Sequence, residues 1–304
     1  MERDLKKIVS QMTLEEKAGM CSGLDFWHLK HVDRLGIPEV MVSDGPHGLR
    51  KQDDKGDHLG MNDSIKAVCF PPAALSACSF DRKLMEEMGE TIGKEAQAND
   101  VSVVLGPAVN IKRSPLCGRN FEYYSEDPYL TGTVAIAETE GVQSNPGVGV
   151  CIKHFAANNQ EDNRNAVNNT ISERAFREIY LKGFEMAVKG AQPMSIMSSY
   201  NLNNSVPAAD DYDLLTDITR GEWGFDGMIM TDWGGGQSTP SISMHAGNDL
   251  IMPGSSVEDI TIRGFSDEEP TFADDDIYPV VNVAESWGGL RATTQWGEFV
   301  LDAA

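Results

Sequence analysis

Seven side chains of three chemical types follow short apolar segments of the chain. They comprise two carboxylates, three cations and two aromatic residues: Asp44, Asp232, Arg119, Lys153, His154, Tyr200 and Trp233. If these groups converge, the charged ones can bond in pairs to neighbouring hydroxyls, and an aromatic ring can pack against the C–H face of a sugar. The set therefore indicates a carbohydrate site. In the alternative interpretation, Lys153 and Asp232 form a buried ion pair that closes a barrel, and Trp233 belongs to the core.

The segment GMIMTDWGGG (227–236) places one of these carboxylates directly after a predicted buried strand. The apolar run MIM ends at Thr231 and Asp232, and three glycines follow Trp233. A carboxylate at this point can cap the strand, or it can form the floor of a substrate pocket. The local pattern leaves both interpretations open.

Strand and helix patterns alternate along most of the chain. Strands are predicted at 37–46, 101–111, 147–156, 195–201 and 227–232, with a further segment at 246–253. A capping box of Thr13 and Glu16 predicts the start of a first helix. Other helices are predicted at 79–100, 128–144, 172–190 and 211–223. Short apolar strands separated by helices are typical of a parallel sheet that is covered on both faces.

Polar residues occupy the C-terminal ends of the successive strands, for example at Asp44, Lys153 and Asp232. A barrel builds its active site in this way, whereas a doubly wound open sheet gathers such residues at one switch point. We therefore predict an α/β fold of the (β/α)8 TIM-barrel type. Six strand segments are convincing, where a full barrel has eight, which leaves open an incomplete barrel.

The composition of the chain changes after residue 254. Residues 255–304 carry eleven acidic residues against two arginines, and they show no helical period. The stretches IYPVVNV, LRATTQW and EFVL resemble short strands joined by turns. We therefore predict a barrel domain at 1–254 and an acidic, β-like C-terminal extension at 255–304, whose role is open.

Charge and composition exclude several classes of function. The net charge of −22 argues against nucleic-acid partners and anionic membranes. No apolar run is long enough for a membrane span, and the N-terminus lacks an apolar signal core, so we expect a cytoplasmic protein. The five cysteines show no framework spacing, which predicts reduced, mostly buried thiols.

The sequence gives no support for a cofactor or a metal. It contains no Walker A motif, no HExxH and no paired CxxC. His28 and His31 are spaced so that both could bind one metal ion, but no third ligand is near them in the sequence. We therefore expect an ordinary surface or packing role for this pair.

Six motifs, in this order, resemble glycoside hydrolase family 3 in its β-glucosidase branch. They are VSDGPHGLR (42–50), LGPAVNIKRSPLCGRNFEYYSEDPYLTG (105–132), KHFAANNQEDNR (153–164), MSSYN (197–201), GFDGMIMTDW (224–233) and AGNDLIMPG (246–254). The resemblance extends over about residues 10–254 and implies retaining, exo-acting hydrolysis of terminal β-D-glucosyl residues on a barrel domain. It further implies Asp232 as nucleophile, Asp44, Arg119, Lys153 and His154 as ligands of the sugar hydroxyls, and Tyr200 and Trp233 as walls of the subsite. No metal is needed for this chemistry.

The nucleophile of such an enzyme must be ionised, and we expect Lys153 and Arg119 to keep the pKa of Asp232 low. A second carboxyl, about 5–5.5 Å from the first, must act as general acid and base. In this branch it usually comes from a separate α/β-sandwich domain after the barrel or, in permuted members, before it. The loop KHFAANNQEDNR also lacks the histidine that the β-N-acetylglucosaminidases of the family use. Glu161 and Asp162 on this loop are weak candidates.

Three explanations of the missing acid remain open. It can come from a complementing sandwich domain on another polypeptide, as in a split or permuted enzyme, or be absent from a truncated product. It can also come from the extension, with Glu285 and Glu298 as weak candidates, or from a loop of a second copy in a homo-oligomer. Two functions therefore stand: a β-glycosidase acting on a β-glucoside or oligosaccharide, and a non-catalytic sugar-binding or scaffold protein. The choice between glucose and xylose is open.

Overall fold

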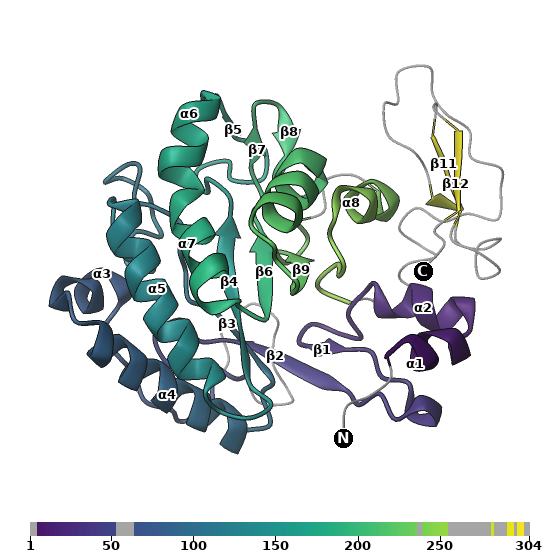
Figure 1. The fold of residues 1–304 in the computed structure, drawn as a ribbon, viewed down its shortest axis with the longest axis horizontal. Helices are drawn as coiled ribbons and strands as arrows, with labels where there is room; N and C mark the ends of the chain where they lie inside the picture. The colour runs from purple at the N-terminus through teal and green to yellow at the C-terminus, as the bar shows by residue number, and fades with distance from the viewer. Residues whose placement is uncertain are drawn as a thin grey trace.

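The computed structural model describes residues 5–52, 64–235 and 239–254, and beyond them three short strands. Within these residues, the main sheet of the protein contains six strands. Their order across the sheet is β1 (His28–Leu29), β2 (Val40–Asp44), β3 (Val103–Leu105), β4 (Gly149–Phe155), β6 (Ser195–Ser198) and β9 (Met228–Thr231). Neighbouring strands are parallel except β1 and β2, which are antiparallel. Figure 1 shows this sheet at the centre of the molecule.

Isolated bridges continue the strand pairing beyond the last strand, β9. They join Met230 to Leu250, Ile251 to Ser22, and Gly23 to Leu29 of β1. The series of pairs that starts at β1 therefore returns to β1, which gives the sheet its barrel-like form. The predicted α/β, TIM-barrel-like architecture is confirmed at this level. The contributions of residues 22–23 and 28–29 were not predicted, because two residues are too few to show a strand period.

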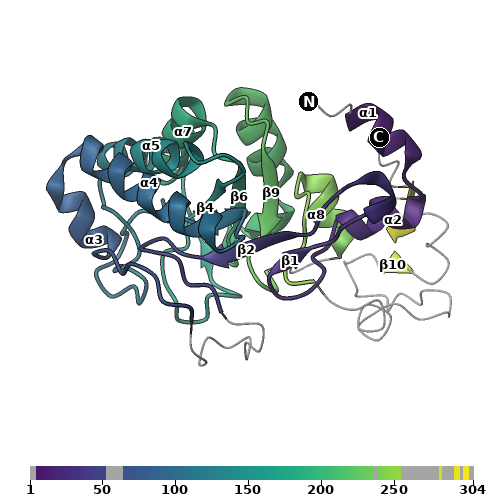
Figure 2. The same cartoon turned by 90° about the horizontal axis from the view of Figure 1, so that it is seen from below.

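Helices cover the outside of the sheet. They are α1 (Leu5–Gln11), α2 (Leu14–Met20), α3 (Ala73–Ser76), α4 (Arg82–Ala98), α5 (Pro128–Gln143), α6 (Glu173–Ala175), α7 (Lys182–Ala191) and α8 (Pro240–Ala246). Within the part of the chain that the structure describes, two segments form π-helices, η3 (Phe176–Tyr180) and η5 (Asp213–Glu222), and three form 3₁₀-helices, η1 (Asp33–Leu35), η2 (Ala77–Ser79) and η4 (Ala208–Asp210). Helices α4, α5 and α7 lie side by side on one flank of the sheet (Figures 1 and 2).

Strand alternation separates two apolar clusters. The outward cluster packs under the helices and takes from the strands Met41, Val104, Val150, Ile152, Ile196 and Ile229. The inward cluster takes the alternate positions and consists of Val42, Val103, Leu105, Cys151, Met197, Met230, Leu250 and Met252. Successive side chains of a strand point to opposite faces, so each buried strand contributes to both clusters. This explains why the strands are almost continuously apolar.

The helix boundaries follow local sequence signals. Thr13 and Glu16 form the predicted capping box at the start of α2. The helix predicted at 172–190 is present, but η3 interrupts it with one wider turn between α6 and α7. The helix predicted at 211–223 appears as η5. The strand predicted at 101–111 is shorter, since Gly106 and Pro107 follow β3 directly and Pro107 has no N–H to donate.

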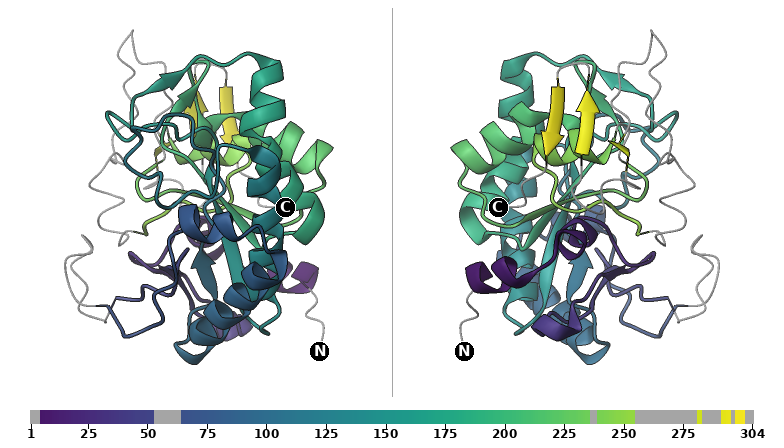
Figure 3. Two further views of the ribbon diagram at one scale, coloured as in Figure 1. Left: turned by 90° about the vertical axis from the view of Figure 1, so that its left-hand side faces the viewer. Right: turned by 90° about the vertical axis from the view of Figure 1, so that its right-hand side faces the viewer.

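The extension contributes three strands to the described structure. These are β10 (Val281–Asn282), β11 (Arg291–Thr294) and β12 (Gly297–Val300), which form a separate antiparallel sheet. Figure 3 shows β11 and β12 as adjacent arrows of opposite direction. The strands β10, β11 and β12 overlap the short strands predicted from IYPVVNV, LRATTQW and EFVL respectively. The remainder of the predicted extension at 255–304 lies outside the described residues.

Two smaller observations concern the described helices and the cysteines. None of the described helices is long and apolar enough to cross a membrane. All five cysteines are free thiols, but only Cys117 and Cys151 are buried, while Cys69 and Cys78 are exposed. The expectation of mostly buried thiols is therefore wrong, because Cys69 and Cys78 lie in the connection around α3 and η2 rather than on strands.

A buried acid on α5 should make the stability of the fold depend on pH. Glu138 accepts a hydrogen bond from the Tyr124 hydroxyl, and burial raises its pKa from 4.5 to about 8. The folded chain therefore keeps a proton that the unfolded chain loses above pH 4.5. From this group alone, the free energy of unfolding should fall by about 1.4 kcal/mol per pH unit between these two pKa values.

Glu138→Gln should remove this slope and leave the chain more stable than the wild type above pH 8. Urea denaturation followed by circular dichroism over pH 5–9 measures both curves. Glu140→Gln, a substitution of an exposed acid on the same helix, is the control and should leave the slope unchanged. Parallel curves for wild type and Glu138→Gln would contradict the buried protonated acid.

Candidate active site

On three strands, the inward-facing side chains change from apolar core residues to charged residues at the C-terminal end. Each row passes from the inward cluster to a charged residue two positions later: Val42 to Asp44, Cys151 to Lys153, and Met230 to Asp232. A step of two residues keeps the side chain on the same face of a strand. The strands therefore bring two carboxylates and an ammonium group together above the inward cluster.

All seven predicted site residues line one pocket of about 340 Å³. The other lining residues are Phe26, Trp27, Arg50, Gln52, Leu105, Arg164 and Met197. The structure therefore brings these seven residues together. The roles assigned to them remain predictions.

Asp232 lies at the end of β9 with 8 % of its surface exposed. Its Oδ1 accepts a hydrogen bond of 2.7 Å from the N–H of Trp233, and its Oδ2 lies 3.7 Å from Nε2 of His154. Burial raises the pKa of Asp232, and it outweighs the opposing effect of Arg119 and Lys153. The expectation of a low pKa is therefore wrong: the cations are close enough to act, but desolvation is the larger effect.

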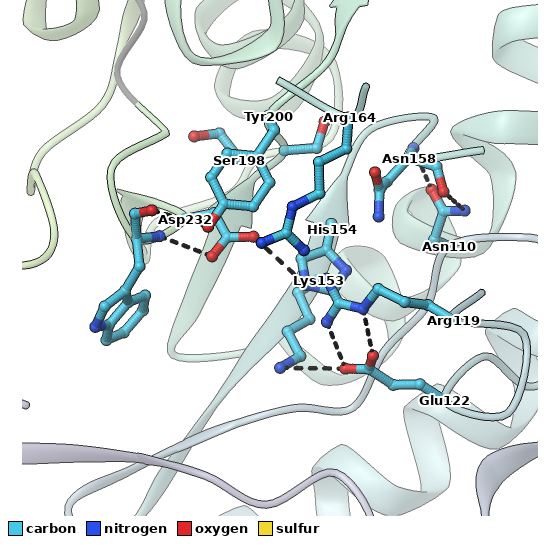
Figure 4. A network of polar contacts seen from close by, with 12 residues as sticks. Asn110, Arg119, Glu122, Lys153, His154, Asn158, Arg164, Ser198, Tyr200 and Asp232 are labelled. Atoms are coloured by element: carbon cyan, nitrogen blue, oxygen red, sulfur yellow. Dashed lines mark hydrogen bonds and ion pairs between the residues drawn. The ribbon is translucent and has the colours of Figure 1, made fainter. Parts of the chain in front are cut away.

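Four charged groups, Asp44, Arg119, Glu122 and Lys153, form a network beside Asp232. Figure 4 shows how Arg119 and Lys153 meet at Glu122. Nζ of Lys153 lies 3.4 Å from Asp44 and 3.3 Å from Glu122. Arg119 donates two hydrogen bonds, of 2.7 and 2.9 Å, to the Glu122 carboxylate. Although burial opposes ionisation, Lys153 and Arg119 lower the pKa of Glu122 to about 2. Among the described ion pairs, Lys153 binds Asp44 and Glu122, so the alternative interpretation of a Lys153–Asp232 pair is not observed.

His154 is buried between Asp232 and Tyr123. Its Nδ1 lies 2.9 Å from the Tyr123 hydroxyl. Burial, reinforced by the nearby Arg119 and Lys153, lowers the pKa of His154 well below its ordinary value. The imidazole is therefore neutral at physiological pH.

Aromatic residues form one wall of the pocket. Trp233 packs near Trp27, with ring centroids 5.5 Å apart, and its Nε1 donates to the carbonyl of Phe26 over 2.8 Å. The Tyr200 hydroxyl donates to the carbonyl of Trp233, and the Arg164 guanidinium lies 4.5 Å from the Tyr200 ring centroid. This wall offers flat aromatic rings to a ligand, while its polar edges are held by backbone carbonyls.

None of the four candidates for the missing acid is seen to line the pocket in the described part of the structure. Glu161 is engaged by Asn158 and Arg164 at 3.1 and 3.0 Å, and neither it nor Asp162 lines the pocket. Glu285 lies outside the described residues, and the side chain of Glu298 is not described. Among the described lining residues, Asp44 and Asp232 are the two carboxyl groups.

Several residues of the site were not predicted from the sequence: Phe26, Trp27, Arg50, Glu122, Tyr123 and Arg164. Two of them carried a visible signal. Glu122 follows Arg119 by three residues in GRNFE, and Arg164 ends KHFAANNQEDNR. Phe26 and Trp27 precede β1, a strand too short to be recognised.

Comparison with known proteins places this chain in a family. A model of the glycosyl hydrolase family 3 N terminal domain matches residues 30–259. The chain belongs to glycosyl hydrolase family 3. This confirms the resemblance drawn from the motifs. The confirmation includes the β-glucosidase branch and the restriction to the barrel domain.

Family 3 relatives are highly similar over this region. Thermostable beta-glucosidase B of Acetivibrio thermocellus is 54% identical over 253 residues, which are 83% of this chain and 33% of the relative. The exo-alpha-(1->6)-L-arabinopyranosidase of Bifidobacterium longum is 51% identical over 260 residues, or 85% of this chain and 34% of the relative. Beta-glucosidase 3B from Thermotoga neapolitana, solved with alpha-D-glucose, matches with a TM-score of 0.77 and 44% identity, over 83% of this chain and 36% of that one. This chain thus spans about a third of each relative's length.

Proposed function

We propose that this chain carries the sugar subsite and the nucleophile of a retaining, exo-acting β-glycosidase that acts on terminal β-D-glucosyl residues. The observation that carries the proposal is the Asp232 carboxylate, held by the Trp233 N–H in a pocket with hydroxyl-binding charges and an aromatic wall. Similarity to beta-glucosidases supports the same reaction.

The reaction consists of two displacements at the anomeric carbon. In the first, an oxygen of Asp232 forms a bond to the anomeric carbon while the bond between this carbon and the leaving-group oxygen breaks. An acid protonates the leaving-group oxygen. In the second, water attacks the glycosyl ester from the face the leaving group vacated, gives up a proton to the conjugate base, and releases Asp232. In this proposal Asp44, Arg119 and Lys153, which line the pocket, bind the sugar hydroxyls through contacts that tighten in the oxocarbenium-like transition state.

The proposed acid comes from outside the described residues. Asp44 is the second carboxyl among the described residues of the pocket, but Lys153 and Arg50 both lie 3.4 Å from it. Both of its oxygens are thus engaged in ion pairs, Oδ1 with Lys153 and Oδ2 with Arg50. A complementing α/β-sandwich domain would supply the acid and the binding site for the leaving group.

A comparison of leaving groups tests this proposal. Dinitrophenolate departs without protonation, whereas an alkoxide from cellobiose needs an acid, whose contribution is about 10²–10⁴-fold. The 304-residue chain should therefore release dinitrophenol from its β-glucoside in steady state, and cleave cellobiose at least about 10²-fold more slowly. Since one relative is an arabinopyranosidase, the α-L-arabinopyranoside is assayed in parallel.

Two controls separate the outcomes. Calorimetric titration with glucose reports whether the subsite is formed. Binding of glucose without release of dinitrophenol from either glycoside would instead identify a sugar-binding protein. Equal turnover of cellobiose and the aryl glucoside would show that an acid is present within the chain.

A further inference from the structure

The His154 ring connects the Asp232 carboxylate to a buried series of polar side chains. Its Nε2 lies 3.7 Å from Oδ2 of Asp232, while its Nδ1 lies 2.9 Å from the Tyr123 hydroxyl. That hydroxyl also lies 2.9 Å from Nδ2 of Asn158. Tyr123, His154 and Asn158 each have at most 1 % of their surface exposed, so water does not compete for these contacts.

Glu161 fixes the orientation of the Asn158 amide. Nδ2 of Asn158 lies 3.1 Å from Oε1 of Glu161, and Oε2 of the same carboxylate accepts from Arg164 over 3.0 Å. A carboxylate in an ion pair accepts hydrogen bonds only, so the amide must turn its NH₂ group toward it. The reversed amide would place two oxygens in contact. The orientation holds even though Oδ1 of Asn158 finds no partner among the described residues.

The direction of the next hydrogen bonds follows from this orientation. Nδ2 of Asn158 has two hydrogens and points one toward Glu161 and one toward the Tyr123 oxygen. The Tyr123 hydroxyl oxygen then accepts a hydrogen bond from Asn158. The single hydrogen of this hydroxyl is therefore donated to Nδ1 of His154. A neutral imidazole that accepts at Nδ1 carries its proton at Nε2, on the side of Asp232.

We propose that Tyr123 and Asn158 are positioning residues that fix His154 in the Nε2–H tautomer, so that it presents an N–H donor beside the nucleophile. In the proposed glycosidase, on which this consequence rests, the donor binds the sugar hydroxyl nearest Asp232. The opposite tautomer would present a lone pair to the Asp232 carboxylate and give the sugar no donor. A neutral donor also adds no positive charge next to the developing oxocarbenium ion.

Nitrogen-15 spectroscopy of the histidine rings tests the proposal without substrate or turnover. Long-range ¹H–¹⁵N correlation spectra of the labelled 304-residue chain distinguish the two tautomers, and the His154 signals are those missing in His154→Gln. The expected wild-type spectrum at pH 7 shows a neutral ring with its proton on Nε2. A proton on Nδ1, or an imidazolium, would overturn the assignment. Because no sugar is present, this result is independent of whether the chain hydrolyses glycosides.

Two variants distinguish whether Tyr123 or Asp232 fixes the tautomer of His154. In Asp232→Ala the Nε2–H tautomer should persist, because the Tyr123 hydrogen bond remains; a change to Nδ1–H would show that Asp232 sets the tautomer. In Tyr123→Phe the Nδ1 resonance should move downfield, since this acceptor nitrogen loses its donor. An unchanged Nδ1 resonance would show that the tyrosine does not donate to it.

Tyr180→Phe is the matched control for the loss of a buried hydroxyl. Tyr180 is 9 % exposed, and its hydroxyl accepts from Nε of Arg113 at 3.0 Å rather than contacting His154. It should leave the His154 resonances unchanged. Circular dichroism of each variant shows whether the fold is retained, so that a spectral change reports the hydrogen bond and not unfolding.

Discussion

Replacing Asp232 by asparagine should abolish covalent labelling by a 2-deoxy-2-fluoro-β-D-glucoside with a dinitrophenol leaving group. It should also lower kcat for dinitrophenyl β-glucoside by about 10⁴-fold or more, in the range found when other covalent nucleophiles are removed. The amide has the size of the carboxylate and can keep the 2.7 Å hydrogen bond from the Trp233 N–H, but it is a poor nucleophile. Intact mass and peptide mapping locate the adduct, and initial rates give kcat.

The matched control is Asp226→Asn, the same substitution at an exposed position just before β9. It should keep both the adduct and the turnover. In Asp232→Gly, added azide should restore release of dinitrophenol and form α-glucosyl azide, because the anion attacks from the face that Asp232 occupied. An adduct that persists in Asp232→Asn, or maps to another residue, would assign the nucleophile elsewhere.

Strand periodicity explains which part of the site could be predicted from the sequence. Asp44, Lys153 and Asp232 each follow a recognisable apolar strand, and the strand step of two residues carries them onto the inward face. Parallel strands place such ends at one edge of the sheet, so convergence could be inferred without knowing a single distance. The pattern therefore located the pocket and its principal charges.

The loop after β3 shows what the sequence could not reveal. Glu122 and Tyr123 lie in an irregular connection with no period, where charged residues are normally solvated. Only the structure shows that both are at most 5 % exposed and face Lys153 and His154. The same limit applies to the pKa of Asp232: the sequence indicated the neighbouring cations, but the extent of burial decides the direction.

Glu122→Ala should lower the free energy of unfolding by about 3–5 kcal/mol, because it removes the carboxylate that Arg119 and Lys153 share in a buried site. Lys153 is 4 % exposed and would keep only the contact with Asp44, while Arg119 would lose both of its hydrogen bonds. Two cations would then face each other without the anion between them. Urea denaturation at pH 7, monitored by circular dichroism, measures the loss.

Glu185 provides a matched control, since it also lies between two cations but on the surface of α7. It binds Lys182 at 2.9 Å and Lys189 at 2.8 Å, and its side chain is 24% exposed. Glu185→Ala should cost at most about 1 kcal/mol, because solvent screens such pairs. Equal losses for the two variants would mean that burial of the Glu122 network adds nothing to stability.

The pH dependence of the Glu122 effect distinguishes a lost charge from a lost side chain. Its pKa is about 2 in the folded chain, against an ordinary value of 4.5. The folded state therefore binds this proton more weakly than the unfolded state does. The stabilisation from the carboxylate is fully present above pH 4.5 and is lost as the pH falls through the folded pKa. The difference between wild type and Glu122→Gln should accordingly be largest at pH 7 and shrink between pH 4.5 and 2, whereas a packing defect would be the same at every pH.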